Sequence, residues 1–363
     1  MRISFLFIPF ILVLVVPALF SQTTAVDYYN LGNDRYKQQD YDGAISNYSK
    51  AIALDPKYTA AYQDRGLARE ANKNYAGAII DFTKVLELVP RNPSAFYERG
   101  HVKMVMGDSD GASVDYSKAI EIDPGHAKAY YFRGVIRGFK LDAAGEVSDY
   151  SKAIELDPKY DSAYFSRGIA RKLKGDVEGA ITDYTETIKL NPKSKLAYYN
   201  RGKERDGKKD YDGAIADYTK VIELDPNDVN AYQNRGLVRH EKKDYDEAIV
   251  DFTNVLELDP KMVSAYYNRG DAKKLKRDYD GAIADYARYL ADNPGLIRLY
   301  IDLGAMKYFK KDYDGAVVDF TKAIEFLPEY ASLYRGRAAA YRALNNIKRA
   351  EADEKRANKL EKK

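Results

Sequence analysis

The sequence contains no cysteine and only three histidines among its 363 residues. Without cysteine the chain can form no disulfide, carry no thiolate nucleophile and hold no iron–sulfur or zinc–thiolate site. The three histidines are His101, His126 and His240, and no two of them have the spacing of metal ligands. We therefore expect neither a metal site nor another cofactor.

Motifs of catalysis and of nucleic-acid binding are also missing. No serine stands in a Gly-x-Ser-x-Gly motif, and the glycines are not clustered into a phosphate-binding loop. The net charge of +3 provides no strongly basic footprint for nucleic acid. The sequence predicts a protein that is not an enzyme and does not bind nucleic acid.

What the chain has instead is a repeat of 34 residues without a single insertion. Glycine recurs at this interval at Gly32, Gly66, Gly100, Gly134, Gly168, Gly202, Gly236, Gly270 and Gly304. Proline recurs in step at Pro56, Pro90, Pro124, Pro158, Pro192, Pro226, Pro260, Pro294 and Pro328. A fixed period of about 34 residues is typical of a helix–turn–helix solenoid. Below, positions within a repeat are numbered so that the shared glycine is position eight.

Each repeat carries the start and stop signals of two helices, here called helix A and helix B. Position sixteen is a helix N-cap residue in all ten repeats, namely Asp40, Asn74, Asp108, Asp142, Asp176, Asp210, Asp244, Asp278, Asp312 and Asn346. The proline at position thirty-two cannot continue helix B and therefore ends it. These signals predict a helical hairpin in every repeat.

The glycine inside helix A needs a compensating contact, because glycine in a helix costs roughly 1 kcal/mol relative to alanine. Position twenty, on helix B, is alanine in most repeats: Ala44, Ala78, Ala112, Ala180, Ala214, Ala248, Ala282 and Ala316. We expect this glycine and alanine to face each other, so that the two helices approach closely. Tyrosine or phenylalanine at positions four and twenty-four would fill the flanks.

This pattern resembles the tetratricopeptide repeat family, whose motif has an aromatic at four, a small residue at eight, alanine at twenty, an aromatic at twenty-four and proline at thirty-two. The resemblance covers about nine-tenths of the chain. It implies an all-α fold, a right-handed superhelical solenoid of about ten helix-turn-helix repeats. Nine of these span residues 25–330, and residues 331–363 form a degenerate tenth repeat with a C-terminal capping helix.

Repeats two to eight share an arginine at position seven and an aspartate at position twenty-three. The arginines are Arg65, Arg99, Arg133, Arg167, Arg201, Arg235 and Arg269, and the aspartates are Asp81, Asp115, Asp149, Asp183, Asp217, Asp251 and Asp285. Because each arginine is matched by a carboxylate at the same period, we interpret them as a ladder of ion pairs. The alternative is an anion-binding stripe of arginines.

Repeats three and four are irregular, most clearly at Glu146, which stands at position twenty where a small residue belongs. If it faces Gly134, its carboxylate must turn outward, find a partner or spread the helices. The two interpretations are local drift in a tolerant array and a hinge or binding insertion.

Residues 1–24 have the pattern of a secretory signal peptide. Arg2 is followed by an apolar stretch to Phe20 that Pro9 and Pro17 interrupt. The stretch also reaches the lower limit for a membrane-spanning helix, so an uncleaved N-terminal anchor is the alternative. Either way we expect the repeats to be exported, to the periplasm, the cell envelope or the medium.

The resemblance implies that positions two, five, six, nine, twelve and thirteen of helix A line a concave groove that binds peptides. Position five is aromatic in six repeats, and position six is asparagine in three consecutive ones. We therefore predict that an extended peptide is held by Tyr131, Phe165, Tyr199, Asn200, Asn234, Tyr267 and Asn268. The alternative is that these residues only reflect duplication of an ancestral repeat.

A second binding mode of the family, a clamp for carboxylate tails, requires lysine at position five and asparagine at position nine of one repeat. Only Asn33 fits position nine, and Tyr29 stands where the lysine should be. This mode is disfavoured.

Together these features predict a non-enzymatic protein- or peptide-binding scaffold. One alternative is a membrane-tethered subunit of an assembly or secretion complex. Another is a repeat region that serves an enzyme, but almost no sequence lies outside the repeats to hold a catalytic domain.

Overall fold

The structure, a computed structural model, describes residues 23–362, which form twenty α-helices and no β-strand. The predicted signal peptide, residues 1–24, lies almost wholly outside the described residues. Within residues 23–362, no helix combines the length and the apolar character needed to span a bilayer.

The chain divides into two compact units, the first ending at Pro158 and the second beginning at Lys159. Unit 1 contains α1 (Ala25–Lys37), α2 (Tyr41–Leu54), α3 (Thr59–Ala71), α4 (Tyr75–Leu88), α5 (Pro93–Val105), α6 (Ser109–Ile122), α7 (Ala127–Phe139) and α8 (Ala143–Leu156). Unit 2 contains α9 (Asp161–Leu173), α10 (Val177–Leu190), α11 (Lys195–Gly207), α12 (Tyr211–Leu224), α13 (Val229–Glu241), α14 (Tyr245–Leu258), α15 (Val263–Leu275), α16 (Tyr279–Asp292), α17 (Ile297–Phe309), α18 (Tyr313–Phe326), α19 (Ala331–Ala343) and α20 (Ile347–Glu361).

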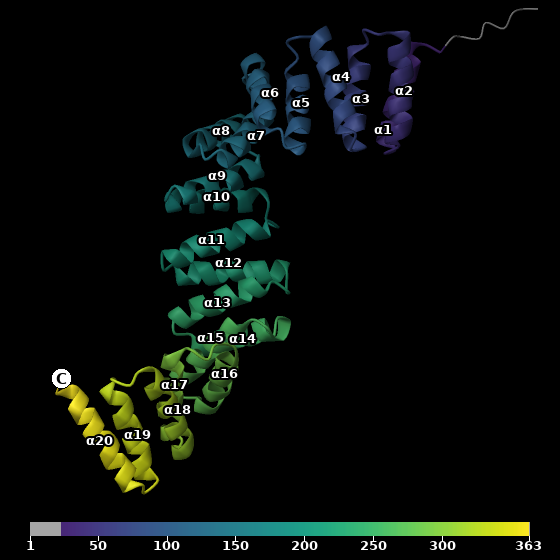
Figure 1. Ribbon diagram of the computed structural model, residues 1–363. Coiled ribbons are helices and arrows are strands. Elements are labelled where there is room, and N and C mark those ends of the chain that lie inside the picture. Colours follow the sequence, from purple (N-terminus) through teal and green to yellow (C-terminus); the bar gives the residue numbers. More distant parts are fainter. Residues whose placement is uncertain (1–22, 363) are drawn as a thin grey trace, which may run out of the picture. The chain divides into compact units, whose positions relative to one another are not determined.

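The helices pair in the order of the sequence. Each odd-numbered helix packs against the even-numbered helix that follows it, and within each unit that helix packs against the next odd-numbered one (Figure 1). Contacts are therefore local in the sequence, which is the property that defines a solenoid. The predicted all-α architecture of ten helical hairpins is confirmed.

The predicted capping residues all stand immediately before a helix B. Nine of the ten side chains accept a backbone N–H from the third residue of the helix, as Asp210 does from Gly213 at 3.1 Å. The exception is Asp244, which makes no cap hydrogen bond and instead lies 3.1 Å from the ammonium of Lys242. Each cap pairs one of the backbone donors that a helix start leaves free.

The turn between the two helices uses a left-handed backbone at position fifteen in all ten repeats. Only two of these residues are glycine, Gly107 and Gly175, and the rest include Lys209 at φ 62° and Leu141 at φ 62°. The left-handed residue closes the helix end, since the backbone N–H of Asp210 then reaches the carbonyl of Arg205 at 2.9 Å. This recurring conformation was not predicted from the sequence.

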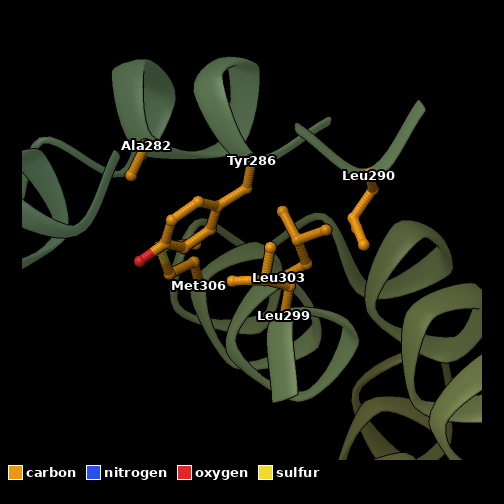
Figure 2. Packing of buried hydrophobic residues seen from close by; sticks show 6 residues of the cluster. All are labelled: Ala282, Tyr286, Leu290, Leu299, Leu303 and Met306. Carbon is orange, nitrogen blue, oxygen red and sulfur yellow. The ribbon is translucent and has the colours of Figure 1, made fainter. Parts of the chain in front are cut away.

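The hydrophobic core is a series of small clusters that join neighbouring repeats. Figure 2 shows one of them, in which Tyr286 of α16 points toward Leu299 and Met306 of α17. Tyr286 is fully buried and Met306 is 3 % exposed. Because each cluster joins helix B of one repeat to helix A of the next, no single hairpin holds a complete core.

The nearest neighbour of the helix A glycine is an aromatic ring, which the sequence had placed only on the flanks of the contact. A Cβ atom on Gly66 would lie 2.6 Å from Cε1 of Phe82, and one on Gly270 would lie 2.8 Å from Cδ1 of Tyr286. Both rings belong to position twenty-four, not to the alanine at position twenty. The glycine therefore makes room for a buried aromatic ring.

Candidate functional site

The arginines at position seven are held inside the fold. Arg201 donates to both carboxylate oxygens of Asp217, at 2.9 and 2.6 Å, and its remaining nitrogen donates to the hydroxyl of Thr185 in the preceding repeat at 3.0 Å. Its guanidinium also lies 5.7 Å from the ring centroid of Tyr198. Each guanidinium thus has a carboxylate on one edge, a hydroxyl on another and an aromatic ring against its face.

The same paired geometry recurs along the chain, and the predicted ladder is confirmed. The bonded pairs are Arg65–Asp81, Arg99–Asp115, Arg133–Asp149, Arg167–Asp183, Arg201–Asp217, Arg235–Asp251, Arg269–Asp285 and, in the tenth repeat, Arg337–Asp353. Sequence reasoning overlooked the last pair, although it stands at the same positions seven and twenty-three.

Each of these aspartates in repeats two to eight also contacts a second cation, from position eleven of helix A. The second partners are Arg69, Lys103, Arg137, Arg171, Arg205, Arg239 and Lys273. The seven carboxylates of repeats two to eight are therefore each neutralised twice, and the arginines are engaged within the fold. This geometry argues against an arginine stripe that is open to an anionic ligand.

Repeat nine lacks the arginine, and the consequence is visible at its aspartate. Leu303 occupies position seven, so Asp319 keeps only Lys307, at 2.8 Å. Burial raises the pKa of Asp319 above its ordinary value, because a single cation does not offset the loss of water.

Glu146, the irregular residue of repeat four, is accommodated by a hydrogen bond and by the space beside a glycine. Its carboxylate occupies the space beside Gly138, where a Cβ atom would lie 2.6 Å from Oε1, and Tyr150 donates a hydrogen bond to it. The missing side chain at Gly138 thus compensates for the large one at position twenty. The expected conflict with Gly134 does not arise.

Five of the predicted groove residues lie on three successive A helices of unit 2. Tyr199 and Asn200 are on α11, Asn234 is on α13, and Tyr267 and Asn268 are on α15, all of them half-buried. The amide of Asn234 donates to the hydroxyl of Tyr199 at 2.8 Å, so position six of one repeat is joined to position five of the repeat before it. Asn200 donates to the backbone carbonyl of Leu196 at 2.8 Å.

The aromatic residues at position five contribute partly to packing. The ring of Phe165 on α9 lies 5.8 Å from that of Tyr184, and Tyr131 on α7 lies 5.6 Å from Tyr150. Tyr267 likewise stacks on Tyr286 at 6.0 Å. In each case the partner is position twenty-four of the same repeat, so one face of each ring is committed to the fold. Tyr131 belongs to unit 1 and Phe165 to unit 2.

A polar network in the groove of unit 2 was not predicted. Asp271 accepts from His240 at 3.1 Å and from the hydroxyl of Tyr286 at 3.1 Å, and it pairs with Lys274 at 2.9 Å. Lys274 also contacts Asp302 at 3.0 Å. The hydrogen bond from His240, with Lys274 and Tyr286, holds the pKa of Asp271 well below its usual range. The charges in this part of the groove are therefore matched.

Unit 1 has a different set of polar groups on its A helices. Tyr29 donates to Asp64 at 2.6 Å, and Nδ1 of His101 lies 2.7 Å from Glu70. A pocket of about 150 Å³ opens beside them. Its lining comprises Asn33, Tyr36, Lys37, Tyr48, Asp64 and Leu67. Asn33 accepts from the hydroxyl of Tyr48 at 2.8 Å.

One sequence signal could have located these polar networks. A hydroxyl at position twenty-four reaches the side chain at position nine, as Tyr48 reaches Asn33 and Tyr286 reaches Asp271. Where position twenty-four is phenylalanine, position nine is apolar: Leu67 with Phe82, Leu237 with Phe252 and Ala305 with Phe320. A phenylalanine therefore excludes this bond, but a tyrosine alone does not predict it, because Tyr150 and Tyr184 accompany the apolar Val135 and Ile169.

Comparison with known families matches three parts of the chain. Residues 32–73 and 208–242 match a family described as TPR repeat, and residues 93–126 and 229–262 match families described as tetratricopeptide repeat. No curated protein matches the sequence.

Solved structures provide the comparison for the fold. The C-terminal part of a TPR repeat-containing protein from Cytophaga hutchinsonii has a TM-score of 0.57 and 19% identity, and the match covers 66% of this chain and 98% of that one. A tetratricopeptide repeat protein from Parabacteroides merdae has a TM-score of 0.48 and 19% identity, over 68% and 98% of the two chains. YrrB, described as a TPR protein with an unusual peptide-binding site, has a TM-score of 0.48 and 20% identity, over 51% and 95%.

The repeat period, the paired helices and the family matches agree on one assignment. The chain belongs to the tetratricopeptide repeat family.

Proposed function

We propose that the protein is a non-enzymatic scaffold that binds an extended peptide or protein segment along the A helices of unit 2. The observation that carries the proposal is the bond between Asn234 and Tyr199, at 2.8 Å. It fixes a groove side chain in place while leaving the amide oxygen and one N–H of Asn234 available to a ligand. Ordered groups of this kind bind with a lower entropic cost.

Asn200, Asn234 and Asn268 recur once per repeat, so each can address a successive segment of one peptide backbone. Asn200 uses one N–H for the carbonyl of Leu196 and retains its oxygen as an acceptor. Such contacts with a peptide backbone have little sequence preference. Selectivity would then come from side chains that differ between repeats, such as Asp206 and His240.

The test is a triple change of Asn200, Asn234 and Asn268 to alanine in the full chain. Peptides are first selected from a displayed random library on the unaltered protein and then measured against both proteins. Each amide-to-backbone bond contributes about 0.5–1.5 kcal/mol, so we expect binding to weaken by roughly one to three powers of ten.

A matched control is Asn254→Ala on α14, whose amide makes the same kind of bond, to the carbonyl of Val250 at 3.0 Å. It should leave peptide binding unchanged. Equal binding by the triple variant and the unaltered protein would remove the asparagines from the site, and recovery of no peptide would refute the proposed function.

We further propose that the repeats act outside the cytoplasm, on the basis of the signal-like pattern in residues 1–24. Fractionation of the native cell, followed by N-terminal sequencing of the mature chain, tests this. A mature chain that starts near Ala25 supports cleavage and export. A chain in the envelope that still begins at Met1 would favour the membrane-tethered assembly subunit, and a cytoplasmic chain would contradict export.

A further inference from the structure

Glu98, at position six of α5, is a half-buried carboxylate without a partner. Within residues 23–362 it makes no hydrogen bond and no ion pair. The nearby His101 is already bonded to Glu70 through Nδ1 at 2.7 Å, and Lys128 acts on Glu98 only at longer range. A charge that has lost part of its water without gaining a partner is costly to the folded protein.

A second unsatisfied group lies in the same repeat. The side chain of Tyr116 on α6 is fully buried, and its hydroxyl has no hydrogen-bond partner among the described residues. Tyr48 and Tyr286, at the same position of other repeats, donate to position nine, which in this repeat is His101. Burial raises the pKa of Tyr116, and the charges of Tyr97, Glu98 and Glu70 add to the rise.

Aromatic rings lie around Tyr97, the residue that precedes Glu98 on α5. Tyr97, the neighbour of Glu98 on α5, lies 4.8 Å from the ring of His126 and 6.1 Å from that of Phe132. Phe132 in turn stacks on Tyr116 at 6.0 Å. A cation beside aromatic rings is attracted by the electrons of their faces, in addition to its attraction to a carboxylate.

We propose that Glu98 and Tyr97 form a recognition site for a cationic side chain, the arginine or lysine of a peptide bound in the groove of unit 1. The proposal goes beyond the proposed function, because the peptide site proposed above lies on unit 2 and this one lies on unit 1. Glu98 accepts the hydrogen bonds of the cation, and Glu70 strengthens the negative potential around it. An anionic ligand would be repelled by both carboxylates.

The groove of unit 2 provides a contrast within the same chain. Tyr184 also has an unpaired hydroxyl, but the carboxylate that acts on it, Glu204, has Lys172 at 3.7 Å. Asp271 and Asp302 share Lys274. These three carboxylates have cations of their own, whereas Glu98 does not.

The test measures the coupling between Glu98 and the peptide's cation in the full chain. Peptides selected on the unaltered protein should be enriched in arginine or lysine. One selected peptide is then synthesised with its arginine or lysine and again with glutamine in that place. A hydrogen bond to a charged group typically corresponds to about tenfold or more in affinity. We expect the glutamine peptide to bind about tenfold more weakly to the unaltered protein, and less than about threefold more weakly to Glu98→Gln.

Glu121→Gln is the matched control, since Glu121 lies in the same repeat but is exposed on α6 and paired with Lys118. It should keep the full tenfold difference. Equal binding of the glutamine peptide to Glu98→Gln and to the unaltered protein shows that the variant is folded. Absence of enrichment, or the same tenfold loss in Glu98→Gln, overturns this site and leaves the proposed function standing. Recovery of no peptide at all overturns both.

Discussion

At the scale of the residue, the fold depends on buried aspartates that are each held by two cations. Asp217 is 2% exposed and accepts hydrogen bonds from Arg201 and Arg205, at 2.6 and 2.8 Å. Asp217→Ala would leave both guanidinium groups without their carboxylate. Removing one partner of a buried pair typically costs about 3–5 kcal/mol, and we expect a loss of that size in the free energy of unfolding measured with urea.

The control for this change is Asp212→Ala on the same helix. The side chain of Asp212 is 84% exposed and lies 3.0 Å from Lys242. Exposed pairs contribute about 0–1 kcal/mol, so the control should be nearly neutral. A small effect of both changes would mean that the ladder does not stabilise the fold.

Glu98 makes stability depend on pH in a defined direction. Burial and the nearby Glu70 raise the pKa of Glu98 from 4.5 to about 7 in the folded chain. Between these values the folded state binds more protons than the unfolded one, so the free energy of unfolding falls as pH rises through this window. After allowance for the partial exposure of the group, we expect Glu98 to contribute about 1–2 kcal/mol to this fall.

The measurement is urea unfolding of the unaltered chain and of Glu98→Gln at about pH 5 and about pH 8. His101, whose pKa the Glu70 hydrogen bond raises, also lowers stability as pH rises, but it is present in both proteins. Glu98 also contributes to the raised pKa of His101, so the difference between the two proteins reports Glu98 together with its coupling to His101. An identical pH dependence in both would contradict the raised pKa.

At the scale of the element, the glycine of helix A decides how closely the two helices of a hairpin pack. A Cβ atom on Gly66 would meet the buried ring of Phe82 at 2.6 Å. Gly66→Ala should therefore lower stability by about 1–3 kcal/mol, the usual cost of overpacking. This loss would outweigh the gain of roughly 1 kcal/mol in helix propensity. Thermal unfolding followed by circular dichroism measures the change.

Gly207→Ala is the opposite case and serves as the control. Gly207 is the last residue of α11, and a Cβ atom there would have nothing within 4 Å. The higher helix propensity of alanine should then raise stability by up to about 1 kcal/mol. If both changes stabilise the protein, the rings do not fix the distance between the helices.

The elements that could be predicted from sequence are those whose signal is a single residue in a fixed place. A cap such as Asp210 or a stop such as Pro226 acts on its own backbone, so it can be recognised without neighbours. The ion-pair ladder was predictable because both partners share the repeat period. The partner of Gly66 was not, because the ring that covers it depends on how two helices approach.

Two further features of the structure could not be predicted from the sequence. The left-handed turn is imposed by the joining of two helices, and residues such as Lys209 and Leu141 have no preference for it. On the A helices, position twelve of one repeat meets position nine of the next in two places, but with the residue types exchanged: Glu70 with His101, and His240 with Asp271. Because the residue types at these positions change from repeat to repeat, the contact leaves no simple periodic pattern. The asparagines were therefore predicted and the unpaired Glu98 was not.

At the scale of the whole molecule, each repeat is stabilised by its neighbours. Ala214 is fully buried against Tyr218 of its own helix and Val238 of the next repeat. Ala214→Leu should cost about 1–3 kcal/mol by overpacking. Hydrogen exchange should show the loosening centred on repeats five to seven and fading toward repeat ten, because a solenoid couples nearest neighbours. Uniform loosening throughout unit 2 would show that the unit opens as a single cooperative body.

The hydroxyl that accepts the remaining hydrogen bond of each arginine affects how the number of repeats can change. Arg235 bonds Thr219 of the repeat before it at 2.9 Å, and Arg269 bonds Thr253 in the same way at 3.1 Å. Each such repeat carries the threonine hydroxyl that accepts from the arginine of the next repeat. Deletion or duplication of one whole repeat by recombination therefore restores the same hydrogen bond between neighbouring repeats. A break inside a repeat would instead separate an arginine from its aspartate. The first repeat has Leu31 at position seven, so it has no arginine that would bond a hydroxyl of a preceding repeat. It is therefore compatible with arrays of different repeat number.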